Sequence, residues 1–234
     1  MCIMLTTTNE GRASLARRSF LKYGGATLAT ASLVMTGCED FYDLIPRKPV
    51  KGVRLGKGDT GILNYAYTLE QLEARFYTLA VAASVNCNFS DEELKILMDL
   101  QKHEAIHKDF FKAALGKDAI TELEFDFSAI DFTSRTSVLE AAKTFEDLGV
   151  AAYNGAGKLL ESSDLLLIAG KIVSVEARHA AAIRSVLDDD PTSFAGDDVI
   201  DANGLDRAYS TQTVLEAAAP FIVNEIDASE LPTS

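Results

Sequence analysis

The chain has 234 residues, of which 24% are charged and 47% are hydrophobic, and its formal net charge is −13. So acidic a chain repels the phosphate backbone of nucleic acids, which excludes a nucleic-acid partner. The sequence has no tryptophan and has long runs rich in Ala, Leu, Glu and Lys, a composition that favours helices over a β-sandwich.

The N-terminal segment has the features of an export signal. "RRSFLK" at 17–22 resembles the twin-arginine export motif, and the apolar stretch after it is too short to span a membrane. "MTGC" at 35–38 resembles a bacterial lipobox, in which Cys38 is the lipidated residue. We therefore predict a signal segment over 1–37 and a lipoprotein of the bacterial cell envelope, anchored to a membrane and facing the periplasm or the outside. Cleavage without lipidation and an uncleaved anchor are the alternatives.

Four amphipathic runs follow a predicted tether. Residues 38–57 mix prolines, glycines and charges, as tethers do. The next four runs place apolar residues at helical spacing, and the second starts with Ser90 and Glu93 at the spacing of a capping box. These runs predict helices at about 60–84, 91–115, 136–161 and 164–188.

The lengths of the connections predict the fold. About twenty residues separate the second and third helices, whereas the other connections are short. This pattern is typical of a four-helix bundle with one long crossover, so we predict an all-α fold whose bundle spans 58–188. The acidic tail at 189–234 holds a short helix at about 213–223. Five tail residues could surround calcium, but their spacing misses the EF-hand pattern and a solvated loop is expected instead: Asp197, Asp198, Asp201, Asn203 and Asp206.

The sequence "HEAIH" at 103–107 has two metal-binding interpretations. As H-E-x-x-H it fits a zinc protease, in which two histidines one helical turn apart hold zinc and the glutamate acts as a base. As E-x-x-H it fits the half-site that di-iron carboxylate proteins place on a bundle helix. A second E-x-x-H occurs at Glu176 and His179, where Val175 precedes the glutamate. This repetition favours the di-iron interpretation.

The first and third helices repeat a different pair of residues. Tyr77 follows Glu70 by seven residues, and Tyr153 follows Glu146 by the same interval. The chain therefore reads as two copies of one helical hairpin, each with Glu and Tyr on its first helix and Glu-x-x-His on its second.

The glutamates and histidines of the second and fourth helices interrupt apolar stripes that we expect to meet at the bundle axis. In the second helix, Glu104 and His107 share such a stripe with Leu97, Leu100 and Phe111. An unpaired carboxylate in that position is costly or stays protonated. Two divalent cations balance four carboxylates, and histidines add nitrogen ligands, so metal is the simplest explanation of such a core.

The motifs "LEQLEARFY", "EAIH", "FEDLGVAAY" and "EARH", in this order, resemble those of the ferritin-like di-iron superfamily, especially its exported branch related to plant desiccation-associated proteins. The resemblance covers about 60–188. It implies that Glu104 and Glu176 bridge two metal ions, and that each ion has one further carboxylate and one imidazole. It also implies that Tyr77 and Tyr153 donate hydrogen bonds to ligand carboxylates. The remaining implied ligands are Glu70, Glu146, His107 and His179.

Three further side chains lie close in sequence to the predicted ligands. Glu73 lies one turn from Glu70, but the repeat aligns it with Gly149, so Glu70 is the preferred ligand. His103 lies one position from the stripe and is expected at the rim or on the surface, with a hydrogen bond to a ligand as the alternative. Glu140 is expected on a solvated face.

The resemblance implies two iron ions that react with dioxygen or peroxide, and hence ferroxidase or peroxide-reducing chemistry. Manganese with catalase-like activity, and a non-catalytic structural or stress-protective module related to desiccation, are the alternatives. A zinc protease is disfavoured because "KDFFKA" lacks the G-x-x-H continuation. Ala105 stands where bacterioferritins carry the haem methionine, and no Cys-x-x-Cys pair is present, so neither haem nor a rubredoxin module is expected. The anchor and the tail argue against a closed storage cage, while a smaller homo-oligomer stays open.

Overall fold

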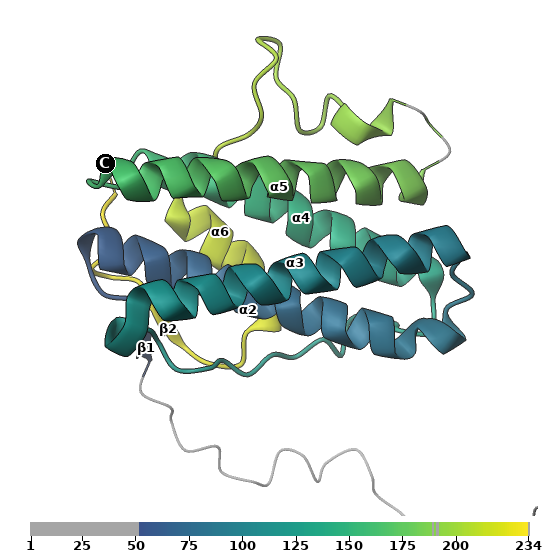
Figure 1. The fold of residues 1–234 in the computed structure, drawn as a ribbon, viewed down its shortest axis with the longest axis horizontal. Coiled ribbons are helices and arrows are strands. Elements are labelled where there is room, and N and C mark those ends of the chain that lie inside the picture. Colours follow the sequence, from purple (N-terminus) through teal and green to yellow (C-terminus); the bar gives the residue numbers. More distant parts are fainter. Residues whose placement is uncertain (1–51, 189, 191, 234) are drawn as a thin grey trace, which may run out of the picture. The chain divides into compact units, whose positions relative to one another are not determined.

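The computed structural model describes residues 52–188, 190 and 192–233. The signal segment predicted over 1–37, the lipidation predicted at Cys38 and most of the predicted tether lie outside these residues. Four long helices make up most of the described chain and pack side by side as a bundle (Figure 1). They are α2 at Gly58–Ala83, α3 at Asp91–Leu115, α4 at Arg135–Gly157 and α5 at Ser163–Leu187.

These helices confirm the predicted all-α bundle. The closest packing joins α2 to α3 and α4 to α5, so each half of the bundle is a helical hairpin, and α2–α4 and α3–α5 contacts join the halves. Helix α4 ends at Gly157 and not at 161, because Leu159 and Leu160 donate backbone hydrogen bonds to Ala156 and Gly157 and so turn the chain back. Within the described residues, no helix is both long and apolar enough to cross a bilayer.

Serine side chains start three of the four bundle helices. Ser90 accepts a hydrogen bond from the backbone N–H of Glu93, whose carboxylate accepts one from the backbone N–H of Ser90, which is the predicted capping box. Ser134 caps α4 and Ser162 caps α5 in a simpler way, by accepting one backbone hydrogen bond each. Because the caps satisfy N–H groups that the helix itself leaves unpaired, they fix where each helix begins.

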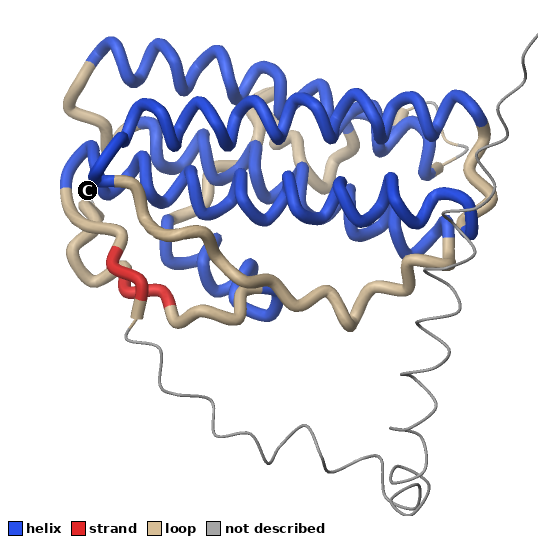
Figure 2. The backbone as a smooth tube through the Cα atoms, turned by 60° about the horizontal axis from the view of Figure 1, so that its bottom comes forward, coloured by secondary structure: helices blue, strands red, loops and turns tan. Residues whose placement is uncertain are grey.

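The long crossover between α3 and α4 runs the length of the bundle (Figure 2). Its start is held by Asn64 on α2, whose amide donates to the carbonyl of Asp118 and accepts from the N–H of Ile120, both at 3.0 Å. Near its end, the ring of Phe132 packs 6.0 Å from that of Phe76, further along α2. The crossover therefore returns the chain to the end of the bundle where α2 finishes, and α4 starts there.

The C-terminal segment adds a short helix and one strand to the bundle. Helix α6 at Thr211–Ala218 stops earlier than the predicted 213–223, because Pro220 has no backbone N–H to continue the helix. Strand β2 at Ile226–Asp227 pairs in parallel with β1 at Val53–Arg54. The predicted tether includes residues 53–57, but β1 and the fully buried Leu55 belong to the folded part.

Arg184 holds the acidic loop that follows α5. Its guanidinium lies 2.6 Å from Asp147 on α4 and 2.8 Å from Asp198 in the loop. Asp201 accepts backbone hydrogen bonds from Asn203 and Leu205, which closes a turn within the loop. Asp198 and Asp201 are thus used in an internal ion pair and in internal hydrogen bonds. Within the described residues, none of the tail acids belongs to a cluster that could hold a metal ion.

Candidate metal centre

Side chains from all four bundle helices converge at the bundle axis. Helices α2 and α4 contribute one glutamate each, and α3 and α5 contribute one glutamate and one histidine each. All four carboxylates are fully buried. The six residues form two groups that share two glutamates, and in each group one ligand atom per residue lies within 4.8 Å of the others. The groups are Glu70, Glu104, His107 and Glu176, and Glu104, Glu146, Glu176 and His179.

In the first group, Nδ1 of His107 faces three carboxylates. It lies 2.9 Å from Oε1 of Glu176. It also lies 3.4 Å from Oε2 of Glu70 and 3.4 Å from Oε2 of Glu104. One imidazole nitrogen and three carboxylate oxygens therefore surround one point, which is a donor set suited to a divalent transition-metal ion.

The second group repeats this arrangement with the other oxygens of the shared glutamates. Nδ1 of His179 lies 2.8 Å from Oε1 of Glu104 and 3.8 Å from Oε2 of Glu176. It lies 3.4 Å from Oε2 of Glu146. Glu104 and Glu176 thus direct one oxygen into each group, as a carboxylate that bridges two metal ions does.

Eight polar atoms of these six residues are buried and have no hydrogen-bond partner. Imidazole nitrogen and carboxylate oxygen atoms of this set lie 2.8–3.8 Å apart. Buried polar atoms in proteins are nearly always paired, so a cluster of eight is best satisfied by cations that all of them can ligate. The atoms are Glu70 Oε2, Glu104 Oε1 and Oε2, His107 Nδ1, Glu146 Oε2, Glu176 Oε1 and Oε2, and His179 Nδ1.

Two tyrosines hold the outer oxygens of two of the glutamates. Tyr77 on α2 donates a hydrogen bond of 2.5 Å to Oε1 of Glu146 on α4. Tyr153 on α4 donates one to Oε1 of Glu70 on α2. Each tyrosine therefore orients the glutamate of the opposite hairpin and leaves that glutamate's Oε2 facing the centre. These are the two tyrosines for which the sequence predicted such hydrogen bonds.

The buried charges perturb one another's ionisation. Burial raises the pKa of Glu70 well above its ordinary value and raises that of Glu146 to about 8. Burial also disfavours the charged form of Glu104, but the imidazoles of His107 and His179 outweigh it and lower the pKa of Glu104 to about 2. Burial likewise opposes protonation of both histidines, yet the surrounding carboxylates raise their pKa values to about 12. The carboxylates of the site therefore favour protonated imidazoles when no metal ion is bound.

A fifth buried carboxylate, that of Glu73, lies beside the centre. It belongs to neither metal-ligating group. A Cβ atom on Gly149 would lie 3.0 Å from Oε1 of Glu73 and 3.6 Å from Oε2 of Glu176, so the glycine makes room for both side chains. Burial raises the pKa of Glu73 well above its ordinary value, and the nearby carboxylates of Glu176 and Glu104 add to this. The sequence repeat aligns Glu73 with Gly149, and the structure brings these two positions together across the bundle.

His103 lies outside both groups but touches one of them. It is exposed, as expected, while its Nδ1 lies 2.9 Å from Nε2 of His179. The structure therefore shows a hydrogen bond from His103 to a candidate ligand, which is the alternative role for this residue. Because His103 and His107 do not meet at a common position, the two histidines of "HEAIH" are not arranged as zinc-protease ligands.

The comparison with known protein families agrees with this architecture. The family model for a ferritin-like domain matches residues 58–189, which is more than half of the chain. The chain therefore belongs to the ferritin-like domain family. No curated protein matches it. The fold of the family and the buried cluster of carboxylates and imidazoles are together compatible with a metal site.

Proposed function

We propose that the protein binds two metal ions, iron by preference, in the buried site and uses them for ferroxidase or related dioxygen- or peroxide-reducing chemistry. The observation that carries this proposal is the set of eight inward-facing atoms without hydrogen-bond partners. Two divalent cations neutralise four carboxylates, which removes the cost of burying them. Membership of the ferritin-like family supports iron as the metal.

Some side chains of the site would bind the ions, and others would orient the residues that bind them. Glu104 and Glu176 direct one oxygen into each group, which suits them to bridge two ions. Tyr77 and Tyr153 orient Glu146 and Glu70, the two carboxylates that belong to only one group each. Two ferrous ions held there would supply the two electrons that, with two protons, reduce dioxygen to hydrogen peroxide.

Manganese is the second candidate metal. Carboxylate oxygens and imidazole nitrogens suit Mn²⁺ and Fe²⁺ alike, so the donor set allows a catalase-like site with the same ligands. A purely structural or desiccation-protective module is a different alternative. It is disfavoured because four fully buried glutamates stabilise a core poorly unless cations neutralise them.

Elemental analysis of the purified protein, followed by aerobic addition of ferrous iron, tests the proposal. We expect two iron ions per chain and rapid oxidation of further ferrous iron. Two manganese ions per chain, with oxygen release from peroxide, would support the second candidate instead. A well-folded protein that takes up neither metal would leave only the structural alternative.

The double variant Glu104→Ala with Glu176→Ala sharpens this test. It removes both shared carboxylates, so we expect metal uptake to be abolished while the circular dichroism stays helical. Glu140→Ala is the matched control, because Glu140 lies on the exposed side of α4. Unchanged metal content in the double variant would refute the assigned site.

We also propose that the protein is exported by the twin-arginine route and anchored through Cys38 to the bacterial cell envelope. The motifs at 17–22 and 35–38 support this, and export in the folded state would allow the metal to be loaded beforehand. Mass spectrometry of the mature protein should find lipid on Cys38. Arg17→Lys together with Arg18→Lys should retain the precursor in the cytoplasm, and export that continues in this variant would argue against the route.

A further inference from the structure

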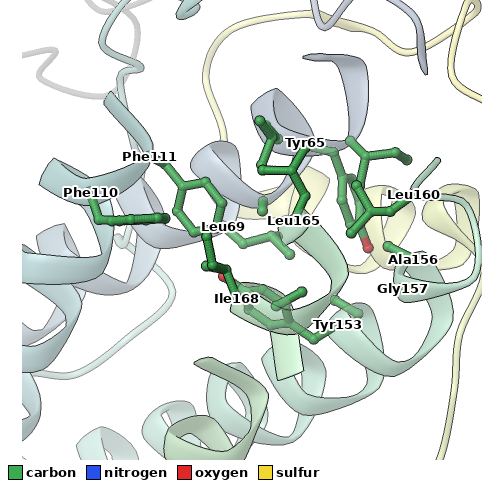
Figure 3. A pocket seen from close by; sticks show the side chains of 15 residues that line it. Tyr65, Leu69, Phe110, Phe111, Tyr153, Ala156, Gly157, Leu160, Leu165 and Ile168 are labelled. Atoms are coloured by element: carbon green, nitrogen blue, oxygen red, sulfur yellow. The ribbon is translucent and has the colours of Figure 1, made fainter. Parts of the chain in front are cut away.

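An apolar cavity of about 30 Å³ lies inside the bundle, between the first half of α2, the end of α3, the second half of α4 and the start of α5. Figure 3 shows Phe111 on one side of it and Ala156 on the other, with Leu69 between them. Only two of its lining side chains, Tyr65 and Tyr153, carry a polar atom. The interior of the cavity is therefore formed almost entirely by carbon.

Tyr153 joins this cavity to the candidate metal centre. Its ring lines the cavity, and its hydroxyl donates the hydrogen bond to Oε1 of Glu70. Leu69, the residue before Glu70, also lines the cavity, as does Phe111, which follows His107 by about one helical turn. A molecule in the cavity is thus separated from a candidate ligand by one aromatic ring.

The chemistry of the lining limits what can occupy this space. A hydroxyl group that enters an apolar site without a hydrogen-bond partner loses about 1–3 kcal/mol, which disfavours water and peroxide. Apolar cavities accordingly stay dry and accept apolar guests such as xenon. A water molecule needs roughly 10–15 Å³ of cavity volume, so this cavity has room for a diatomic molecule but not for a long chain.

We propose that this cavity takes up dioxygen and delivers it to the metal centre past Tyr153. The inference rests on the proposed function, and it makes dioxygen, not peroxide, the oxidant that arrives from this end of the bundle. Peroxide carries two hydroxyl groups and must reach the metals by a polar path. The two oxidants should therefore respond differently when the cavity is filled.

Xenon provides a test that needs neither metal nor substitution. Metal-free protein under xenon pressure should show xenon in the cavity by crystallography, or methyl shifts at Leu69, Leu165 and Ile168 by NMR. In the iron-loaded reaction, xenon pressure should slow the oxidation of ferrous iron by dioxygen and leave the oxidation by peroxide unchanged. Absence of xenon from the cavity would overturn the inference.

Ala169→Leu provides the second test, because this residue of α5 lines the cavity. Ala177→Leu makes the same change at an exposed position of the same helix and serves as the matched control. We expect Ala169→Leu to lose xenon binding and to slow oxidation by dioxygen several-fold, with the peroxide rate and the metal content unchanged. If Ala169→Leu folds poorly, Ala156→Val fills the same cavity from α4 and should give the same result.

The outcomes separate this inference from the proposed function. Equal slowing of both oxidants, or an unchanged dioxygen rate in a variant that no longer binds xenon, would overturn the cavity's role while metal oxidation stands. Failure of the wild-type protein to oxidise iron with either oxidant would instead refute the proposed function, whatever the xenon result.

Discussion

Tyr77 and Glu146 belong to different hairpins, and the tyrosine hydroxyl donates a hydrogen bond of 2.5 Å to the glutamate. This bond points the second oxygen of Glu146 at the metal centre. Tyr77→Phe leaves a buried carboxylate oxygen without its donor, which should cost about 1–3 kcal/mol of unfolding free energy. Lost orientation of the ligand should also weaken metal binding by roughly 10–100-fold.

Chemical denaturation and a competition titration with a metal chelator measure these two effects. Tyr153→Phe should behave in the same way, because it removes the corresponding bond to Glu70. Tyr67→Phe is the control, since Tyr67 is a buried tyrosine of α2 that belongs to neither metal-ligating group. If the control weakened metal binding as much as Tyr77→Phe, the orienting role would be wrong.

Glu70 and Glu73 lie one turn apart on α2 and differ in their relation to the site. Glu70 belongs to the first metal-ligating group, whereas Glu73 belongs to neither. Glu70→Gln should therefore lower the metal content from two ions per chain toward one. Glu73→Gln should leave it at two, because burial already raises the pKa of Glu73 and favours its neutral form, which an amide resembles.

Plasma mass spectrometry of both variants after gel filtration makes the comparison direct. The two substitutions are chemically identical and lie on the same helix, so each is the control for the other. The reverse result, with metal lost from Glu73→Gln alone, would show that the ligand from α2 has been misassigned.

The bundle was largely predictable because its determinants are local. Helical periodicity and serine caps are read within one segment, and α3 begins and ends at the predicted residues 91 and 115. The end of α4 at Gly157 depends on a turn, and the pairing of β1 with β2 joins two dipeptides from opposite ends of the folded part. Neither feature leaves a periodic pattern in the sequence.

The candidate site was predictable to the extent that it repeats. The recurrence of Glu-x-x-His marked the residues that now lie together at the bundle axis. Contacts that occur in only one half of the site leave no repeated pattern in the sequence. His103 contacts His179 between α3 and α5, and Gly149 leaves space for Glu73 between α4 and α2. These contacts depend on how closely the helices approach each other, which spacing along one helix does not encode.

His103 makes the two halves of the site unequal. It contacts Nε2 of His179, whereas Val175 occupies the corresponding place beside the second Glu-x-x-His and offers no such contact to His107. A second hydrogen bond on the far nitrogen fixes the ring and its tautomer. We therefore expect the ion held by His179 to bind more tightly than the ion held by His107.

Calorimetric titration of the metal-free protein with ferrous iron, under anaerobic conditions, should resolve two unequal steps. His103→Val should weaken the tighter step by roughly tenfold and bring the two together. Val175→Ala is the control and should change neither step. In a His179→Ala background, His103→Val should have no further effect on binding; an undiminished effect there would show that His103 acts by another route.

The pKa values of the site predict that metal reverses the pH dependence of stability. Burial raises the pKa of Glu146 to about 8 from an ordinary value of 4.5, so the folded protein binds an extra proton between these values. The carboxylates raise the pKa of His107 from 6.5 to about 12 against the opposing effect of burial, and the sign is the same. Because the folded state holds more protons than the unfolded state, the unfolding free energy of the metal-free protein should fall as the pH rises from about 5 to 9.

Metal ions displace these protons, so loaded protein should instead gain stability over the same range, as deprotonation strengthens metal binding. Only below pH 4.5 does Glu104 act in the opposite direction, because its pKa is lowered to about 2 by the two imidazoles against the effect of burial.

Denaturant unfolding at about pH 6 and pH 8.5, with and without anaerobic ferrous iron, gives the four unfolding free energies needed. The double variant Glu104→Ala with Glu176→Ala should lose the contrast between loaded and unloaded protein. A metal-free wild-type protein that becomes more stable as the pH rises would contradict the expected charge states of the site.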